Sequence, residues 1–451
     1  MAQTLAPGVI TSTGALEHRQ SLEVTGERWS APGWGHGEHR PSHRHLIAEV
    51  RSLDLRPELR GLLDVVVVPT SRPFAETRDG LAVAVELAYQ CRSRLLVLCS
   101  QQAKPEDFPA DLLQRWPVRV ALLQVDGTLV DSFLPALATQ SHPLASAHQR
   151  PPGRDVAQKR NLGLVLARSA GWSHLLFLDD DVRRPVADDE ASSGTDRLGR
   201  WESFGYLSVT NALGNIWARH HDVVGWTMTQ FPDNSALCHA RRRVHLPQSN
   251  FIGGGALAVR VTHDTPFFPS IYNEDWLFLY PYLCRPQAGA VGSAGTIHQA
   301  PYDPFASGRA ESEELGDLLA EGLLGSLEEG DPGIVRDPNF WLEVVRRRQK
   351  MAYDVRWQLL RAQIDGRLSG QDAARIQSSL DGVLAIYDDG ISGVAAECHD
   401  YVKQWQEDLE VWRSALGAVT PRTAEELVSS SATLLKGCSG RDQYLRFRRG
   451  P

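Results

Sequence analysis

The fold is decided by one stretch, His174-Leu175-Leu176-Phe177-Leu178-Asp179-Asp180-Asp181. A short apolar run of this kind is typical of a strand that is buried on both faces. The three carboxylates that follow it repel one another unless a positive charge lies among them. Carboxylate oxygens suit Mg²⁺ or Mn²⁺, and ligands of open α/β sheets bind where strands end. The stretch therefore predicts a metal and phosphate site in preference to a polar turn after a core strand.

Apolar runs on both sides of this stretch predict the rest of a sheet. β-Branched and aliphatic residues favour strands, and they indicate strands at 62–68, 95–99, 118–123, 250–259 and 291–299. Helical spacing is found at 80–92 and 154–171. Strands that alternate with helices imply parallel βαβ units. We therefore expect an α/β domain that contains the acid-rich stretch.

The chain divides into three parts, because its 451 residues are too many for one compact core. Residues 1–60 have little periodic pattern, and we interpret them as a partly irregular, loosely packed N-terminal arm. They hold four histidines whose irregular spacing does not favour a metal site, namely His36, His39, His43 and His45. Residues 61–305 form the predicted catalytic domain. Residues 306–451 form a predicted all-α extension, with helices at 313–327, 340–364, 371–386 and 394–416.

The composition is that of an ordinary globular protein, with 42% hydrophobic and 23% charged residues. The net charge of -8 gives no indication of a nucleic-acid surface. The six cysteines form no C-x-x-C pair, which favours buried free thiols in a reducing compartment. No run approaches the ~18 apolar residues that are needed to span a bilayer. We therefore expect a cytoplasmic protein without a transmembrane segment.

Several further motifs can be combined with the acids into one site. Gly253-Gly254-Gly255 interrupts a predicted strand, which indicates close approach of backbone to a ligand. Lys159-Arg160 lies on the helix before the acids, and Glu274-Asp275 opens a later apolar helix. Together these motifs supply a metal site, phosphate-binding cations and a spare carboxylate base, which suit transfer of a group from a nucleoside diphosphate. The polar segment 186–200 predicts a mobile loop beside the acids.

The set of motifs resembles the GT-A-fold glycosyltransferases, nearest to the family 2-like enzymes. The likeness covers roughly residues 62–300. It is carried, in chain order, by the Val-Val-Val-Val-Pro-Thr run that ends at Thr70, by Lys159-Arg160-Asn161-Leu162-Gly163, by Phe177-Leu178-Asp179-Asp180-Asp181 and by Asn273-Glu274-Asp275-Trp276. The resemblance implies the Rossmann-like fold of the nucleotide-diphospho-sugar transferases, a mixed sheet flanked by helices. The all-α extension lies outside the likeness.

The resemblance also implies a nucleoside-diphosphate-sugar donor that is bridged to the protein by Mn²⁺ or Mg²⁺. Asp181 would be the direct metal ligand, with Asp179 nearer the ribose or a metal-bound water. His298 would complete the metal shell. Thr70 and Arg72 would lie beside the nucleotide.

Further contacts to the donor are expected from Lys159 or Arg160, which would face the diphosphate, and from Asp180 and Gly254. In inverting members of the family the Glu-Asp element supplies the catalytic base. That role would fall to Asp275 here, with Glu274 binding or orienting the acceptor.

The implied activity is a metal-dependent, hexosyltransferase-like transfer of a sugar to an acceptor hydroxyl, with inversion of configuration. The transfer would be non-processive, because Arg356-Trp357 lacks the glutamine of a Q-x-x-R-W motif. Two alternatives stay open. A sugar-phosphate nucleotidyltransferase usually has a glycine-rich loop, where this chain has Pro69-Thr70-Ser71-Arg72-Pro73. The other alternative is a non-catalytic sugar-nucleotide-binding protein. The acceptor is a small molecule, a glycan or a protein, and the helical extension would cover its site or form a homodimer.

Overall fold

The computed structural model describes residues 43–51, 53, 61–148, 155–183, 204–229, 231, 234–248, 250–285, 290–388 and 390–420. All of them belong to one compact unit, Pro41–Pro451. The 186–200 segment, predicted to be a mobile loop, lies outside the described residues, as do His36 and His39. Among the described residues, no helix is long and apolar enough to cross a membrane.

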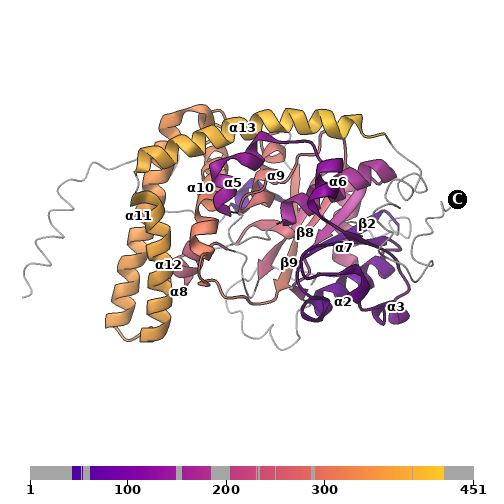
Figure 1. Ribbon diagram of the computed structural model, residues 1–451, viewed down its shortest axis with the longest axis horizontal. Helices are drawn as coiled ribbons and strands as arrows, with labels where there is room; N and C mark the ends of the chain where they lie inside the picture. The colour runs from indigo at the N-terminus through magenta and orange to yellow at the C-terminus, as the bar shows by residue number, and fades with distance from the viewer. Residues whose placement is uncertain are drawn as a thin grey trace, which may run out of the picture. The chain divides into compact units, whose positions relative to one another are not determined.

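One mixed sheet forms the centre of the molecule (Figure 1). Within the described residues its strands follow the order β1-β9-β7-β8-β5-β2-β3-β4, and β6 pairs with β9. The strands are β1 Ala48–Glu49, β2 Val65–Thr70, β3 Arg94–Cys99, β4 Arg119–Gln124, β5 His174–Leu178, β6 Val182–Arg183, β7 Val223–Thr229, β8 Ile252–Arg260 and β9 Val291–Gln299. β5, β2, β3 and β4 are parallel, whereas β8 is antiparallel to both β5 and β7. The predicted mixed α/β class is therefore confirmed.

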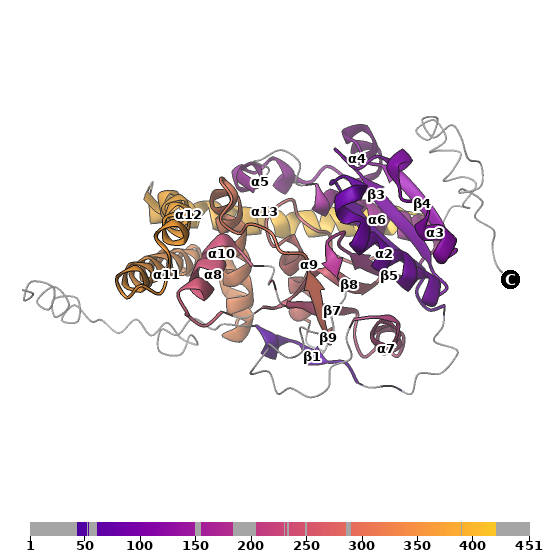
Figure 2. The same cartoon turned by 90° about the horizontal axis from the view of Figure 1, so that it is seen from below.

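The helices of the α/β part cover both faces of the sheet. They are α2 Phe74–Gln90, α3 Leu112–Arg115, α4 Gly127–Phe133, α5 Pro143–His148, α6 Val156–Ala170, α7 Tyr206–Trp217, α8 Ala236–Arg243 and α9 Glu274–Leu283. α2 and α7 pack on one face, and α4, α6 and α9 pack on the other. Figure 2 shows the strands between α6 and α7. Short 3₁₀ turns link these elements at Arg44–Leu46, Pro105–Asp107 and Ala138–Ser141, and a further one lies at Ile334–Arg336.

The central strands are apolar throughout because both of their faces are covered. Successive side chains of a strand point to opposite faces. Val65, Val67 and Phe177 accordingly join the core beneath α6, and Val66 and Leu176 join the core beneath α2. Five strands predicted from such runs are present as β2, β3, β4, β8 and β9, in addition to the acid-bearing β5.

Several elements were not predicted from the sequence. β7 is interrupted at Gly225 by an irregular register, and α7 and α8 are short. β1 and β6 have two residues each, too few to give a sequence pattern. The sequence also predicted a loosely packed arm around His43, whereas this side chain is 3% exposed and contacts Glu321 and Glu328. Its burial follows from ion pairs made far along the chain.

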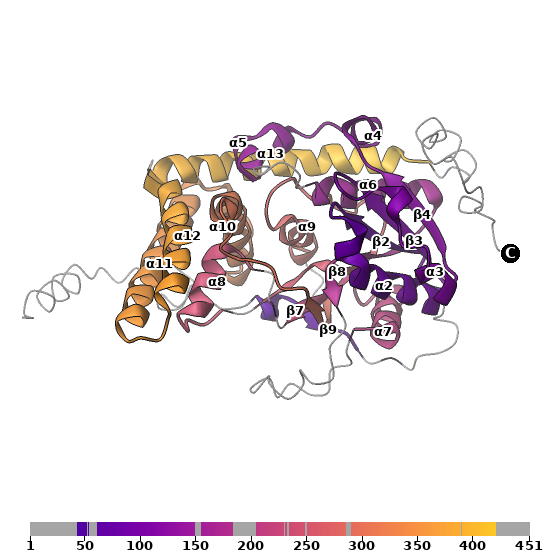
Figure 3. The ribbon, with the colours of Figure 1, turned by 60° about the horizontal axis from the view of Figure 1, so that its bottom comes forward.

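The described chain after residue 306 is helical, as predicted. It forms α10 Arg309–Glu328, α11 Pro338–Ile364, α12 Gly370–Asp388 and α13 Ile391–Ala418. Figure 3 shows α13 running from the end of α12 past α5. The Asp408 carboxylate accepts hydrogen bonds from the Ala138 and Thr139 backbone N–H groups at 2.9 and 2.8 Å. Trp412 Nε1 donates to the Thr265 carbonyl at 2.8 Å, so α13 is fastened to the α/β part.

Candidate active site

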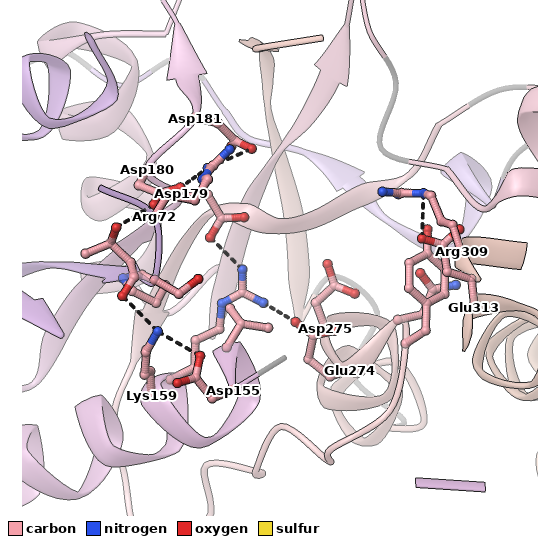
Figure 4. Close-up of a pocket in the computed structure, with 17 residues that line it drawn as sticks. Arg72, Asp155, Lys159, Asp179, Asp180, Asp181, Glu274, Asp275, Arg309 and Glu313 are labelled. Atoms are coloured by element: carbon pink, nitrogen blue, oxygen red, sulfur yellow. Dashed lines mark hydrogen bonds and ion pairs between the residues drawn. The ribbon is translucent and has the colours of Figure 1, made fainter. Parts of the chain in front are cut away.

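A cavity of about 390 Å³ lies where β2 and β5 end, at the carboxyl edge of the parallel strands (Figure 4). It is lined by residues from the ends of both strands, from the start of α6 and from the turn before α9. Nine residues predicted from the sequence line it, namely Thr70, Arg72, Lys159, Arg160, Asp179, Asp180, Asp181, Glu274 and Asp275. The fold therefore brings together side chains that are up to 205 positions apart (275 minus 70).

Asp180 is held by the end of β2. Its Oδ2 accepts a hydrogen bond from Thr70 Oγ1 at 2.6 Å, and its Oδ1 accepts one from Arg72 Nη2. Its backbone is covered by α2, because a Cβ atom at Gly80 would lie 2.1 Å from the Asp180 carbonyl oxygen. Only glycine permits this close approach, which fixes the turn that presents Asp179 and Asp181 to the cavity.

Asp181 is the least satisfied of the three acids. Its Oδ2 lies 3.1 Å from Arg72 Nη2 and accepts a hydrogen bond from Gln299 Nε2 at 3.3 Å. Its Oδ1 is buried and has no hydrogen-bond partner among the described residues. Burial raises the pKa of Asp181 to about 6, the charge of Asp179 adds to the rise, and Arg72 opposes it. A cation beside Oδ1 would relieve both the burial and the repulsion.

Arg160 joins the acids after β5 to the acid pair of α9. Its Nη2 donates to Asp179 Oδ1 at 2.7 Å, and its Nη1 donates to Glu274 Oε1 at 2.5 Å. The guanidinium lies 5.5 Å from the Phe268 ring centre, and the residue is 2% exposed. Burial alone would lower the pKa of Arg160, but its carboxylate neighbours raise it, so it stays charged.

Two glycines of β8 leave the space that the side chains of Arg160 and Asp275 occupy. A Cβ atom at Gly254 would lie 2.3 Å from Arg160 Nη1, and one at Gly253 would lie 2.7 Å from Asp275 Oδ2. The sequence predicted close approach of this backbone to a ligand, whereas the structure shows close approach to the side chains of Arg160 and Asp275. Gly254 itself is not among the described residues that line the cavity.

Lys159 is a buried part of the cavity wall, at 1% exposed. Its Nζ donates to the Thr70 carbonyl at 2.9 Å and lies 2.8 Å from Asp155 Oδ1. Burial lowers the pKa of Lys159, and Asp155 opposes that change. Both contacts fasten α6 to the end of β2.

The acid pair at the start of α9 has two different environments. Asp275 accepts backbone hydrogen bonds through both oxygens, from Gly254 N at 2.5 Å and from Trp276 N at 2.8 Å. Glu274 uses Oε1 for Arg160. Burial raises the pKa of Glu274 to about 8, against the lowering effect of Arg160, and burial also raises the pKa of Asp275.

The helical region forms one wall of the cavity. The sequence had predicted that this region would cover the acceptor site or form a homodimer, but it had not indicated which residues would line a site. Arg309 and Glu313 of α10 line the cavity opposite the Asp179–Asp181 side (Figure 4), and Arg309 Nε lies 2.7 Å from Glu313 Oε1. Asn273, which precedes the acid pair, has a left-handed backbone with φ of 58°. Its Nδ2 donates to Asp317 Oδ1 of α10 at 2.7 Å, so α10 also holds the turn before α9. The only sequence sign of this wall was the Arg309–Glu313 spacing of one helical turn.

His298 was predicted to complete a metal shell, and it lies on β9, paired in register with Arg183 and Thr229. The described cavity lining does not include it. The neighbouring Gln299 contacts Asp181, and successive side chains of a strand point to opposite faces. Gln299 is therefore a β9 side chain that contacts one of the acids, and it was not predicted from the sequence.

The oxygens after β5 fit a hard divalent cation chemically, since such cations prefer carboxylate ligands. The partnerless Asp181 Oδ1 is the strongest sign of that fit. Among the described residues, however, no three His, Cys, Asp or Glu side chains are arranged to hold a metal ion together. Arg72 and Arg160 contact Asp180 and Asp179 instead.

Comparisons with known proteins were made by sequence and by structure. No protein-family model and no curated protein matches the chain. A mycobacterial protein aligns with a TM-score of 0.37 and 14% identity, over 62% of this chain and 80% of its own. The mannosyltransferase PcManGT from Pyrobaculum calidifontis, solved with GDP-Man and Mn²⁺, aligns with a TM-score of 0.34 and 12% identity. The alignment covers 89% of this chain and 92% of PcManGT. The galactosyltransferase LgtC, solved with donor and acceptor sugar analogues, aligns with a TM-score of 0.21 and 12% identity. The alignment covers 44% of this chain and 58% of LgtC. At these scores the alignments support no functional conclusion.

Proposed function

We propose that the protein is a divalent-cation-dependent glycosyltransferase, which moves a sugar from a nucleoside-diphosphate-sugar donor to an acceptor hydroxyl. One observation carries this proposal: Arg160 joins Asp179 to Glu274 across a single cavity. Acids suited to a cation therefore lie on one wall, and a carboxylate suited to proton transfer lies on another. Transfer from a nucleoside diphosphate needs both.

The donor would bind on the side of β2 and β5. We assign Thr70 to the nucleotide and Arg72 to the diphosphate, because Arg72 is the more accessible cation, with a side chain 43% exposed. Asp181 and Asp179 would hold the cation, which when bound would offset charge on the diphosphate. Lys159 is assigned a positioning role, since its ammonium group contacts the Thr70 carbonyl and Asp155.

The acceptor would bind between the acid pair and α10. Its hydroxyl oxygen forms a bond to the anomeric carbon as the bond to the diphosphate oxygen breaks, and its proton passes to a carboxylate. The family resemblance assigns that carboxylate to Asp275. We propose Glu274 instead, because Asp275 already accepts two backbone hydrogen bonds. Burial raises the pKa of Glu274, so its ionised carboxylate is a stronger base than that of an ordinary glutamate. Attack opposite the leaving group would invert the anomeric configuration.

A donor screen tests the proposal. The Tm of the purified full chain is measured with each of a panel of UDP-, GDP-, ADP- and dTDP-sugars. Each donor is tested once in the presence of Mn²⁺ and once in the presence of EDTA. We expect at least one donor to raise Tm with Mn²⁺ and not with EDTA, and its turnover to give a product with the mass of a transferred sugar. Donor binding without any turnover would favour a non-catalytic binding protein. Pyrophosphate release from a sugar phosphate and a nucleoside triphosphate would favour a nucleotidyltransferase.

Two isosteric variants identify the base. Glu274→Gln should lower kcat by about 10²-fold or more and keep the donor-dependent rise in Tm. Asp275→Asn should mainly lower stability, because its amide group would face the N–H of Gly254 or Trp276. The assignment is wrong if Glu274→Gln keeps the wild-type kcat while Asp275→Asn loses it. A product that retains the donor's anomeric configuration would remove the need for either base.

A further inference from the structure

Four exposed apolar side chains form one stripe on α11. Tyr353 is 47% exposed, Trp357 60%, Leu360 46% and Ile364 76%. Their spacing of four, three and four residues follows the helical period, so they lie on one face over about 16 Å. They are four of the eight large apolar side chains that are exposed among the described residues. Scattered exposed apolar residues are ordinary, but a contiguous patch marks an interaction surface.

The stripe lies opposite the buried face of the helix. Val344, Met351, Val355 and Leu359 are buried, and α11 packs on α12 and α13, as Figures 1 and 3 also show. The stripe is half a helical turn away from these residues. The four side chains of the stripe are therefore outside the apolar core of the described helices.

Four charges that flank the stripe between residues 350 and 365 alternate in sign. In chain order they are Lys350, Asp354, Arg361 and Asp365, which lie 60–120° around the helix from Tyr353 at about 100° per residue. Three of the four already have a partner within the chain: Lys350 pairs with Asp354 at 2.8 Å, and Asp365 pairs with Arg367 at 2.9 Å. All of these side chains are exposed. Arg361 is exposed and makes no ion pair with the described residues. The order positive, negative, positive, negative reverses its signs when the helix is read backwards.

We infer that α11 pairs with α11 of a second copy of this chain, antiparallel about a twofold axis between Trp357 and Leu360. Trp357 then meets the partner's Leu360, and Tyr353 meets Ile364 of the partner subunit. On the flank, Asp354 faces Arg361 of the partner subunit, and Lys350 faces the partner's Asp365. In a parallel twofold pair this flank would lie on the opposite side of the interface from its copy. The four charges can therefore pair with one another only in the antiparallel arrangement.

The stripe is small beside a standard interface, which covers about 800 Å² on each partner. The dimer is therefore expected to be weak and to form as the concentration rises. This inference is independent of the proposed transfer reaction, because no residue of the stripe lines the cavity.

The mass of the full chain in solution tests the inference. Light scattering coupled to size exclusion, repeated from micromolar to submillimolar concentration, should show a rise from 49.9 kDa towards twice that mass. Trp357→Glu should stay at 49.9 kDa throughout. Trp217→Glu, at an exposed site on α7 that is 63% exposed, is the matched control and should behave as wild type. Circular dichroism confirms that each variant is folded.

A charge exchange tests the orientation. Arg361→Asp should move the monomer–dimer midpoint to about tenfold higher concentration or beyond, because two aspartates would then face each other. Adding Asp354→Arg to this variant should restore the wild-type midpoint. A wild-type mass of 49.9 kDa at every concentration overturns the inference, as does a Trp357→Glu variant that still associates. A double exchange that fails to restore the midpoint overturns the antiparallel pairing.

Discussion

Two groups of buried acids in this protein have opposite electrostatic surroundings. On α10, Arg348 donates to both oxygens of Glu314 at 2.8 and 2.9 Å and to Asp317 Oδ2 at 2.5 Å. Tyr387 adds a further hydrogen bond to Glu314 at 2.5 Å. After β5, Asp181 keeps one buried oxygen without a described partner. The α10 acids are compensated by donors of the protein itself, whereas the acids after β5 are compensated only in part.

From this difference in compensation we infer a structural role for the α10 acids and a binding role for the acids after β5. A buried charge is stable only when it is paired and hydrogen-bonded. The α10 acids meet that condition and link the helical region to the α/β part. The acids after β5 line a cavity, and the missing compensation there is what a bound cation would supply.

Removal of Arg348 should produce the largest loss of stability. Arg348→Met leaves Glu314 and Asp317 buried without their cation, so the free energy of unfolding should fall by about 3–5 kcal/mol. Urea unfolding of the purified chain measures this. Arg346→Met is the matched control on the same helix, since its side chain is 46% exposed, and it should change stability by less than about 0.5 kcal/mol. Equal effects of the two variants would contradict the compensated network.

The pH dependence of stability tests a second group of compensated buried charges, His43 with Glu321 and Glu328. Burial alone would lower the pKa of His43, but Glu321 and Glu328 raise it from 6.5 to about 9. Because the folded-state pKa lies above the unfolded value, the stabilisation is complete below pH 6.5 and is lost as pH rises through about 9. Proton linkage sets an upper limit of about 3 kcal/mol on the stabilisation that the charged His43 contributes. Urea unfolding on both sides of this window should show the loss in wild type and not in His43→Gln. An identical pH profile for the two proteins would rule out a charged His43.

Gly254→Ala should lower stability by a smaller amount. Gly254 lies against Arg160, which joins Asp179 to Glu274 in the cavity. The added Cβ would lie 2.3 Å from the Arg160 guanidinium, which cannot move without losing Asp179 or Glu274. We expect a loss of about 1–3 kcal/mol, typical of overpacking. Gly127→Ala is the control, because nothing lies within 4 Å of its added Cβ. Thermal unfolding that ranks the two variants equally would show that Arg160 is loosely held.

The sequence predicted the parts of the fold that depend on local pattern. The runs at 62–68 and 174–178 predicted β2 and β5 because strands buried on both faces are apolar throughout. β7 was missed because Gly225 and an irregular register break its pattern. The helical region was predicted as helices that would cover the acceptor site or form a homodimer, but Arg309 and Glu313, which line the cavity, were not predicted.

The site was predicted as a set of residues and not as a set of contacts. The acids, Arg160 and Glu274 come together as their motifs indicated. Their hydrogen bonds depend on how α6, β8 and α9 pack, which no local pattern records. Gln299 and Arg309 were missed for the same reason, since each reaches the site from an element more than 110 positions after Asp181.

Cation binding by two matched aspartate variants tests the central claim most directly. Mn²⁺ is titrated calorimetrically, with UDP or GDP present, into wild type, Asp181→Asn and Asp317→Asn at a temperature where all three are folded. We predict that Asp181→Asn keeps its stability and loses at least about tenfold in Mn²⁺ affinity. About tenfold is the lower end of the cost of losing an outer-shell partner, and loss of a direct ligand should cost no less. Asp317→Asn should lose stability, because Arg348 and Asn273 contact that carboxylate, and keep the wild-type affinity. Wild-type Mn²⁺ affinity in Asp181→Asn would contradict the claim that the acids after β5 form the cation site.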